Sequence, residues 1–161
     1  MSAAFTIRPA TPADAEIICA HRRAMFEAMG VARERIAAMD EPFARWLAPR
    51  LARGCEAYRG WLAENAHGKV IAGAGLWLVE GPPTPSDQSA QRGYVFNVFT
   101  DPDFRRRGIA RQLMNVVMAW CRTNEIHLIA LHASDDGRAL YASLGFEPTN
   151  EMRILLPTSN L

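Results

Sequence analysis

Residues 94–110, YVFNVFTDPDFRRRGIA, decide the fold of this chain. Residues 94–100 are rich in strand formers and lead into a basic turn, Arg105-Arg106-Arg107-Gly108, after which apolar residues recur at helical spacing. This order predicts a strand, a tight turn and a helix start. The first amides of a helix lack partners within it, and the helix dipole adds positive charge there. Because Gly108 and Ala110 are small, the stretch predicts a backbone site for a pyrophosphate or similar anion.

This turn does not identify its ligand by spacing alone. It differs from the G-x-G-x-x-G pattern of dinucleotide sites, and it lacks the lysine and hydroxyl residue of a P-loop. An arginine-rich helix start is often only a solvated turn, so the rest of the chain has to decide what the anion belongs to.

Length and composition indicate one globular domain. The chain has 161 residues, of which 49% are hydrophobic and 22% charged, and we expect a single domain over residues 1–161. The formal net charge of +1 disfavours a general nucleic-acid or membrane-surface binder. No apolar run approaches the roughly 18–20 residues that span a bilayer.

The N-terminal sequence and the cysteines predict a cytoplasmic location. MSAAFTIRPATPAD lacks the basic start and apolar stretch of a signal peptide. The cysteines, Cys19, Cys55 and Cys121, are odd in number and far apart, which is neither a disulfide framework nor a metal-ligand spacing. We therefore expect reduced thiols and no metal site.

The first half of the chain predicts a strand, two helices and a hairpin. Residues 5–8 alternate as a short strand, and Thr11-Pro12-Ala13-Asp14 is typical of a helix start, in a helix that Gly30 would end. Apolar spacing predicts a second helix over about 41–53, ending at Gly54. Two strands, 58–64 and 70–79, flank a turn at 65–68 and predict the hairpin.

The second half predicts a strand–helix–strand crossover, which would pair its two strands in parallel. The strand over 94–100 leads into a helix over about 108–124, and the apolar run 126–131 predicts a strand buried on both faces. A short helix capped by Ser134 and a last strand over 154–156 follow. The layout is a mixed α/β fold around one sheet.

With this layout, NVFTDPDFRRRGIARQLM and LHASDDGRALYASLGFEP resemble the GCN5-related N-acetyltransferase (GNAT) family, over nearly the whole chain. The family's acetyl-CoA signature, Gln/Arg-x-x-Gly-x-Gly/Ala, is matched by Arg105, Gly108 and Ala110. Its second signature is matched by Ser134, Tyr141 and Gly145-Phe146. The resemblance implies a single GNAT-like domain, with a mixed sheet of about six or seven strands, flanking helices and splayed parallel strands at the cofactor site.

The resemblance also implies acetyl-CoA as co-substrate, without a metal. The backbone on the strand edge would pair with the pantetheine, and an amide near Val98 or Phe99 would polarise the thioester carbonyl. The pyrophosphate would rest on the amides from Arg106 to Ala110. The implied cofactor-binding residues are Val98, Phe99, Thr100, Arg105, Arg106, Arg107, Gly108, Ile109, Ala110 and Ser134.

Two residues depart from the family pattern. The family commonly has asparagine where Ser134 stands and alanine where Gly137 stands. Serine has a shorter reach than asparagine, so a helix N-cap is an equally good interpretation of Ser134.

Tyr141 is implied as the general acid, since a phenol with a pKa of roughly 10 suits protonation of a thiolate leaving group. Its alternative is a core aromatic on a short helix. The proton of the amine needs a separate acceptor, and the candidates by chain position are Glu80, Asp87 and His132. Loss of the proton to water through Asn97 is an equally good alternative.

The resemblance implies an enzyme that moves acetyl directly to a primary amine of a small molecule or peptide. One alternative is a non-catalytic acyl-CoA-binding regulatory module, in which Tyr141 is incidental. Another is an RNA-contacting patch of four arginines, Arg105, Arg106, Arg107 and Arg111. The expected partners are the amine acceptor, no nucleic acid and no membrane, and a homodimer could form along the edge of the last strand.

Overall fold

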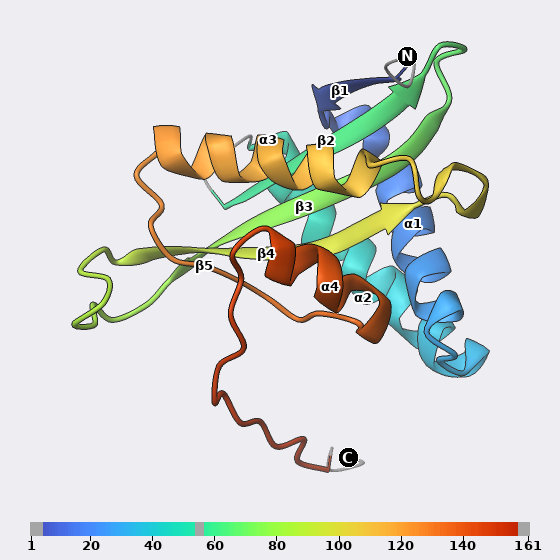
Figure 1. The fold of residues 1–161 in the computed structure, drawn as a ribbon. Coiled ribbons are helices and arrows are strands. Elements are labelled where there is room, and N and C mark those ends of the chain that lie inside the picture. Colours follow the sequence, from blue (N-terminus) through green and yellow to red (C-terminus); the bar gives the residue numbers. More distant parts are fainter. Residues whose placement is uncertain (1–4, 54–56, 158–161) are drawn as a thin grey trace.

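The computed structural model describes residues 5–53 and 57–157, so Gly54 and Cys55 lie outside the described residues. One mixed sheet carries helices on both faces (Figure 1). The described strands are β1 (Phe5–Pro9), β2 (Tyr58–Asn65), β3 (Val70–Glu80), β4 (Gln91–Thr100) and β5 (Ile129–Leu131). The described α-helices are α1 (Ala15–Ala28), α2 (Arg33–Ala52), α3 (Ile109–Thr123) and α4 (Asp135–Ser143), and short 3-10 turns precede α1 and α3.

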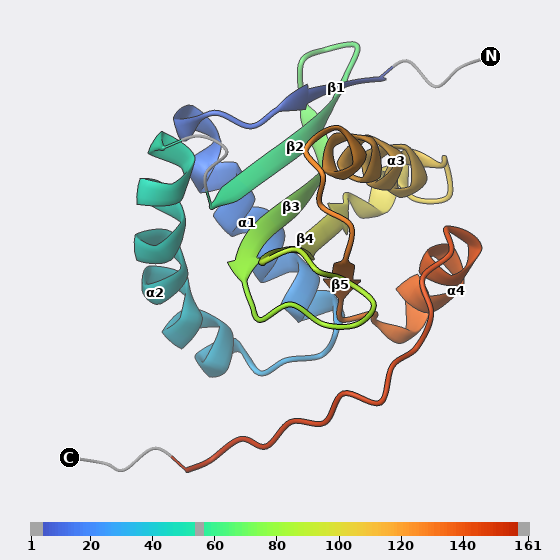
Figure 2. The ribbon, with the colours of Figure 1, turned by 90° about the vertical axis from the view of Figure 1, so that its left-hand side faces the viewer.

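The strands follow chain order in the sheet, β1-β2-β3-β4-β5, and only the β4–β5 pair is parallel. Helices α1 and α2 cover one face, and α3 covers the other (Figure 2). Each face has its own apolar core. The core under α3 includes Leu76, Val95, Leu113, Met114 and Val117, and the core under α1 and α2 includes Ile18, Phe43, Leu47, Tyr58 and Leu62.

Helix α2 begins at Arg33, earlier than the sequence predicts, and passes through Pro42 and Pro49. A proline inside a helix removes one backbone hydrogen bond and normally favours a helix boundary. The buried side chains Ile36 and Phe43 lie on one face of the helix. The burial of this face, with Phe43 packed in the core under α1 and α2, outweighs the local cost of the proline.

Strand β5 is shorter than predicted and only partly buried, and residues 126–128 form an irregular connection between α3 and the strand. Glu125 has a left-handed φ of 58°, and the amide of Ile126 donates to the carbonyl of Cys121 at 2.9 Å. The apolar character of Ile126 therefore serves the core under α3, where it is 5% exposed, and not a strand.

The predicted last strand is absent, and the described sheet has five strands instead of six or seven. Residues 147–157 are all exposed, and the largest exposed apolar side chains of the tail are Met152, Ile154, Leu155 and Leu156. A strand needs a paired edge as well as a suitable sequence, and no strand of the described chain pairs with this segment. The homodimer stays a prediction, without the strand on which it was based.

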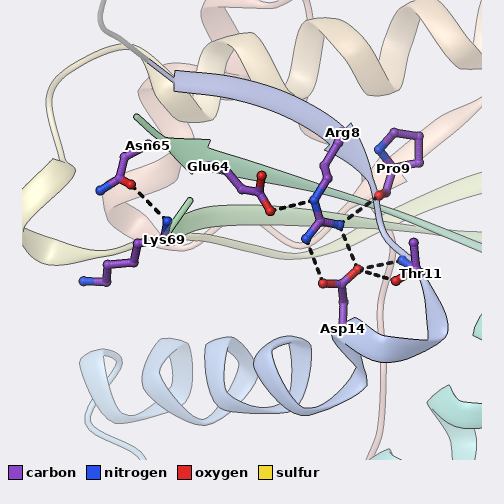
Figure 3. Close-up of polar contacts among 7 residues, drawn as sticks. All are labelled: Arg8, Pro9, Thr11, Asp14, Glu64, Asn65 and Lys69. Atoms are coloured by element: carbon purple, nitrogen blue, oxygen red, sulfur yellow. Dashed lines mark hydrogen bonds and ion pairs between the residues drawn. The ribbon is translucent and has the colours of Figure 1, made fainter. Parts of the chain in front are cut away.

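A polar network at the start of the chain fixes β1 against β2 and α1 (Figure 3). The guanidinium of Arg8 donates to both carboxylate oxygens of Asp14, at 2.8 and 2.9 Å, and to Oε1 of Glu64 at 2.7 Å. The backbone amide and hydroxyl of Thr11 also donate to Asp14. The hydrogen bonds from Arg8 lower the pKa of Asp14 to about 2.

Replacing the buried carboxylate in Asp14→Asn should lower the free energy of unfolding by about 2 kcal/mol, since charge-assisted hydrogen bonds are lost and Arg8 loses its main partner. Chemical denaturation at pH 7 measures this. The control is Asp40→Asn, because Asp40 makes a partly exposed ion pair with Arg23 at 3.5 Å. This substitution should lower the free energy of unfolding by less than about 0.5 kcal/mol. Equal losses in the two variants would contradict the anchoring role.

Candidate active site

Strands β4 and β5 part before β4 ends, which opens the sheet. Their parallel pairing spans only Gly93 to Val95 on β4, opposite Ile129 to Leu131 on β5. Beyond this point β4 continues to Thr100, paired with β3 alone, while the other chain segment diverges toward α4 (Figure 1). The predicted residues Val98, Phe99 and Thr100 therefore lie on the half of β4 that has lost its parallel neighbour.

A bulge at Asn97 accompanies this opening. Gly75 of β3 faces Phe96 and Gly73 faces Phe99, so two residues of β4, Asn97 and Val98, lie opposite one residue of β3. Asn97 has a left-handed φ of 57°, a conformation that asparagine tolerates better than most residues. Bulges of this kind bend the strand and redirect the side chains that follow.

The bulge changes which side chains face which helix. Val95 and Val98 both contact the core under α3, whereas Phe96 packs in the core under α1 and α2. Asn97 also points to α1, where its amide nitrogen donates to the carbonyl of Ile18 at 3.2 Å. Strict alternation would have placed Asn97 beside Val95 in the apolar core. The predicted strand over 94–100 did not include this bulge, although VFNVF repeats an apolar pair across one asparagine, out of phase with a period of two.

The basic turn after β4 leaves its backbone amides free. Gly108 has a φ of 77° and caps α3, and Arg106 has a φ of 64°. The first backbone bond into the helix runs from Gln112 to the carbonyl of Gly108, at 3.1 Å. The amides of residues 106–111 donate to no group in the described ranges. Free amides at the positive end of a fifteen-residue helix fit the phosphates of the predicted cofactor.

The arginine side chains of the turn are partly held by the turn itself. Nε of Arg105 donates to the carbonyl of Thr100 at 3.2 Å, and a terminal nitrogen of Arg107 donates to that of Asp103 at 3.0 Å. The buried side chain of Ile109 anchors the helix start in the core. This arrangement agrees with the expectation that the backbone supplies directional bonds and the arginines supply charge.

Helix α4 begins as predicted at Ser134, whose hydroxyl accepts from the amide of Gly137 at 3.2 Å. The N-cap interpretation is therefore confirmed, while a contact from Ser134 to a cofactor stays a prediction. The structure also gives a reason for glycine at 137. A Cβ there would lie 2.9 Å from a ring carbon of Tyr141, so alanine would push the tyrosine ring aside.

Tyr141 is half-buried, with its ring edge-on to Phe146 at a centroid distance of 5.9 Å. Burial raises the pKa of Tyr141, which keeps the phenol protonated at neutral pH, as a general acid requires. Helix α4 is linked through α3 to the basic turn, because Arg111 of α3 donates to the hydroxyl of Ser143 at 2.7 Å.

The structure separates the three predicted proton acceptors. Glu80 pairs with Gln91 at the beginning of β4, and Asp87 is buried in the loop before that strand. At about 3.3 Å per residue, Glu80 lies roughly 20 Å along the strand from Val98, and Asp87 lies in the loop beyond that end of the strand. His132 directly follows β5, and its ring contacts the hydroxyl of Tyr94. Of these three, His132 is the one that the fold brings to the opening.

A small cavity lies behind the bulge and is partly polar. Its lining comprises Ile18, His21, Tyr58, Gly60, Leu62, Gly73, Ala74 and Asn97. The side-chain oxygen of Asn97 is buried there and accepts no hydrogen bond from the described residues. His21 is 6% exposed, its ring centre lies 4.8 Å from that of Phe99 with the two rings tilted, and burial lowers its pKa to about 4. No sequence motif points to His21.

Comparisons with known proteins agree with this geometry. The family model for the acetyltransferase (GNAT) family matches residues 22–146. The GCN5-related N-acetyltransferase of Ralstonia eutropha JMP134 is 42% identical, with a TM-score of 0.90 over 94% of this chain and 98% of that one. A predicted acetyltransferase of Clostridium acetobutylicum, solved with acetyl-CoA, is 27% identical, with a TM-score of 0.86 over 94% and 96% of the two chains.

A curated human relative matches a shorter segment. N-acetyltransferase 8 is 30% identical over 94 residues, which make up 56% of this chain and 39% of that protein. The chain thus matches well under half of that relative. Within residues 5–53 and 57–157, no helix combines the length and apolar character needed to cross a bilayer.

The burial of His21 predicts a pH-dependent stability. A histidine in the unfolded chain takes up a proton near pH 6.5, whereas folded His21 does so only near pH 4. The unfolded state therefore binds more protons between these values, and the free energy of unfolding should fall as the pH drops from 6.5 to 4, by on the order of 3 kcal/mol. The contribution of Asp14 is lost at lower pH, as the pH falls from 3.8 to about 2.

Denaturant titrations of the wild type and His21→Gln at pH 7 and pH 4 test this. The variant should show the smaller loss of stability between the two pH values. An equal loss in both proteins would show that His21 is not the group responsible.

Proposed function

Since the chain belongs to the acetyltransferase (GNAT) family, we propose that it transfers acetyl from acetyl-CoA directly to a primary amine of a small molecule or peptide. The observation that carries this proposal is the opening between β4 and β5. Because these strands are parallel, their carboxyl ends lie at one edge of the sheet. The basic turn follows β4 at this edge, and the helix with Tyr141 follows β5.

The proposed cofactor-binding residues divide by role. The backbone of Val98, Phe99 and Thr100 would bind the pantetheine arm on the free edge of β4, with Ser134 on the opposite side. The amides of residues 106–110 would bind the pyrophosphate, in the field of Arg105 and Arg107. Bound acetyl-CoA supplies the acetyl thioester.

The chemistry assigned to the protein is orientation, polarisation and proton transfer. A backbone amide near Val98 or Phe99 would stabilise the charge that develops on the thioester oxygen as the amine nitrogen bonds to the carbonyl carbon. Tyr141 would give its proton to sulfur as the carbon–sulfur bond breaks. The amine proton would leave on the α1 side, to His132 or to water beside Asn97.

The proposed location is the cytoplasm. It is supported by Cys19 and Cys121, which are free thiols, both buried. The three cysteines of the sequence have no disulfide spacing.

Removing the phenolic hydroxyl in Tyr141→Phe should lower kcat by about 100-fold, which is within the range for general acid catalysis. The acetyl-CoA Kd should stay within about twofold of the wild-type value. The measurement is thiol release from acetyl-CoA with a panel of amino acids, polyamines, aminoglycosides and short peptides. Tyr58→Phe is the matched control, since Tyr58 is a buried tyrosine on β2.

Unchanged turnover in Tyr141→Phe would remove this residue from the mechanism. Tight acetyl-CoA binding without thiol release to any amine would instead favour the regulatory-module alternative.

Gly108→Val should raise the acetyl-CoA Kd at least tenfold. The φ of 77° strains a β-branched residue, and a Cβ at this position would enter open space beside the free amides. Gly68→Val is the matched control, because Gly68 has a φ of 74° and open surroundings in the turn between β2 and β3. Calorimetric titration with acetyl-CoA compares the variants, and equal Kd values would argue against the phosphate site.

A further inference from the structure

Arg22 of α1 is a half-buried cation that has no acidic partner among the residues that the structure describes. Its guanidinium makes no ion pair or hydrogen bond with any residue in the described ranges, and its Nε is fully buried and unpaired. The adjacent Arg23 differs, since it pairs with Asp40 at 3.5 Å. Burying a charge without a counterion is unfavourable, so an arginine that has no partner among the described residues would be stabilised by an anion that binds to it.

Aromatic rings surround the guanidinium of Arg22. Its central carbon lies 4.5 Å from the ring centre of Phe43, 5.1 Å from that of Phe26 and 5.7 Å from that of Phe96. These cation–π contacts hold the guanidinium in place and use the ring faces. The rings accept no N–H···O hydrogen bond, so the two terminal nitrogens, which unlike Nε are not fully buried, keep their capacity to donate to an oxyanion.

Arg22 also lies next to the opening. Phe96, one of its ring contacts, directly precedes Asn97 at the bulge and follows Val95, the last residue of β4 paired with β5. The same face of the sheet continues with Trp77, which is 36% exposed and contacts Tyr94 edge-on, and Tyr94 contacts His132. A partly exposed aromatic surface thus leads from Arg22 to the edge of the opening. The proposed phosphate turn precedes α3, on the other face.

We propose that Arg22 binds a carboxylate or phosphate group of the acceptor, so that the substrate is a primary amine that also carries an anionic oxygen group. This inference rests on the proposed function and narrows its substrate class. A guanidinium binds such groups through two parallel N–H···O bonds. In a half-buried site the loss of such a pair corresponds to roughly a 10- to 100-fold change in affinity.

The test compares acceptors that differ only in the anionic group. Free amino acids are paired with their carboxamides, and glucosamine 6-phosphate with glucosamine, and kcat/KM is measured for each. The wild type should prefer the anionic member of one pair by at least tenfold, and the preferred pair identifies carboxylate or phosphate as the group. Arg22→Gln should abolish this preference, and Arg22→Lys should retain part of it. Arg23→Gln is the matched control and should keep the full preference.

A preference that survives Arg22→Gln, or a wild type that uses both members of every pair equally well, would overturn the inference and leave the transferase proposal standing. Failure of the transferase proposal is distinguished by a binding measurement. The acetyl-CoA-bound protein is titrated with 2-hydroxy acids and glucose 6-phosphate, which carry the anion but no amine. If the wild type binds these compounds and Arg22→Gln weakens the binding at least tenfold, the result supports the anion site. Equal binding by the two proteins, or no binding by either, refutes it.

Discussion

The extra residue in β4 is the constraint on which the other features depend. Asn97 adopts a left-handed conformation in the middle of a strand, and the chain tolerates it because the side chain bonds to α1 while Val95 and Val98 still reach the core under α3. A regular strand would bury the amide among apolar side chains at a considerable cost. The bulge therefore keeps both cores intact and bends β4 where its pairing with β5 stops.

The sheet keeps two regions of positive charge apart. The turn before α3 offers backbone amides that have no partner among the described residues, and the side chains of Arg105 and Arg107 donate to carbonyls of the same segment. Arg22 lies on the opposite face and carries its charge against aromatic rings. The two regions also differ in chemistry. Backbone amides favour an anion through fixed dipoles, whereas a guanidinium carries a full charge on a side chain that can be substituted.

The sequence predicted best where local chemistry alone determines structure. Residues close together in the sequence determine the cap at Ser134, the turn at Gly108 and the hairpin. The family was also predicted from short motifs of this kind. The errors arose where distant partners decide. Helix α2 passes through Pro42 because the sheet buries its apolar face, and residues 154–156 stay unpaired because a strand-like sequence does not supply an edge. The bulge and the surroundings of Arg22 also depend on contacts between segments far apart in the chain, which no single sequence motif indicates.

Glycine at position 137 affects how firmly Tyr141 is held. Helix α4 spans nine residues, and a glycine in its first turn makes so short a helix still less stable by itself. Its order then depends on neighbours such as the Arg111–Ser143 bond and the packing of Tyr141 on Phe146. An element held this way opens locally well before the whole domain unfolds. Any ligand that steadies α3 would also suppress these openings, so occupancy of the turn and the order of the proposed acid are thermodynamically linked.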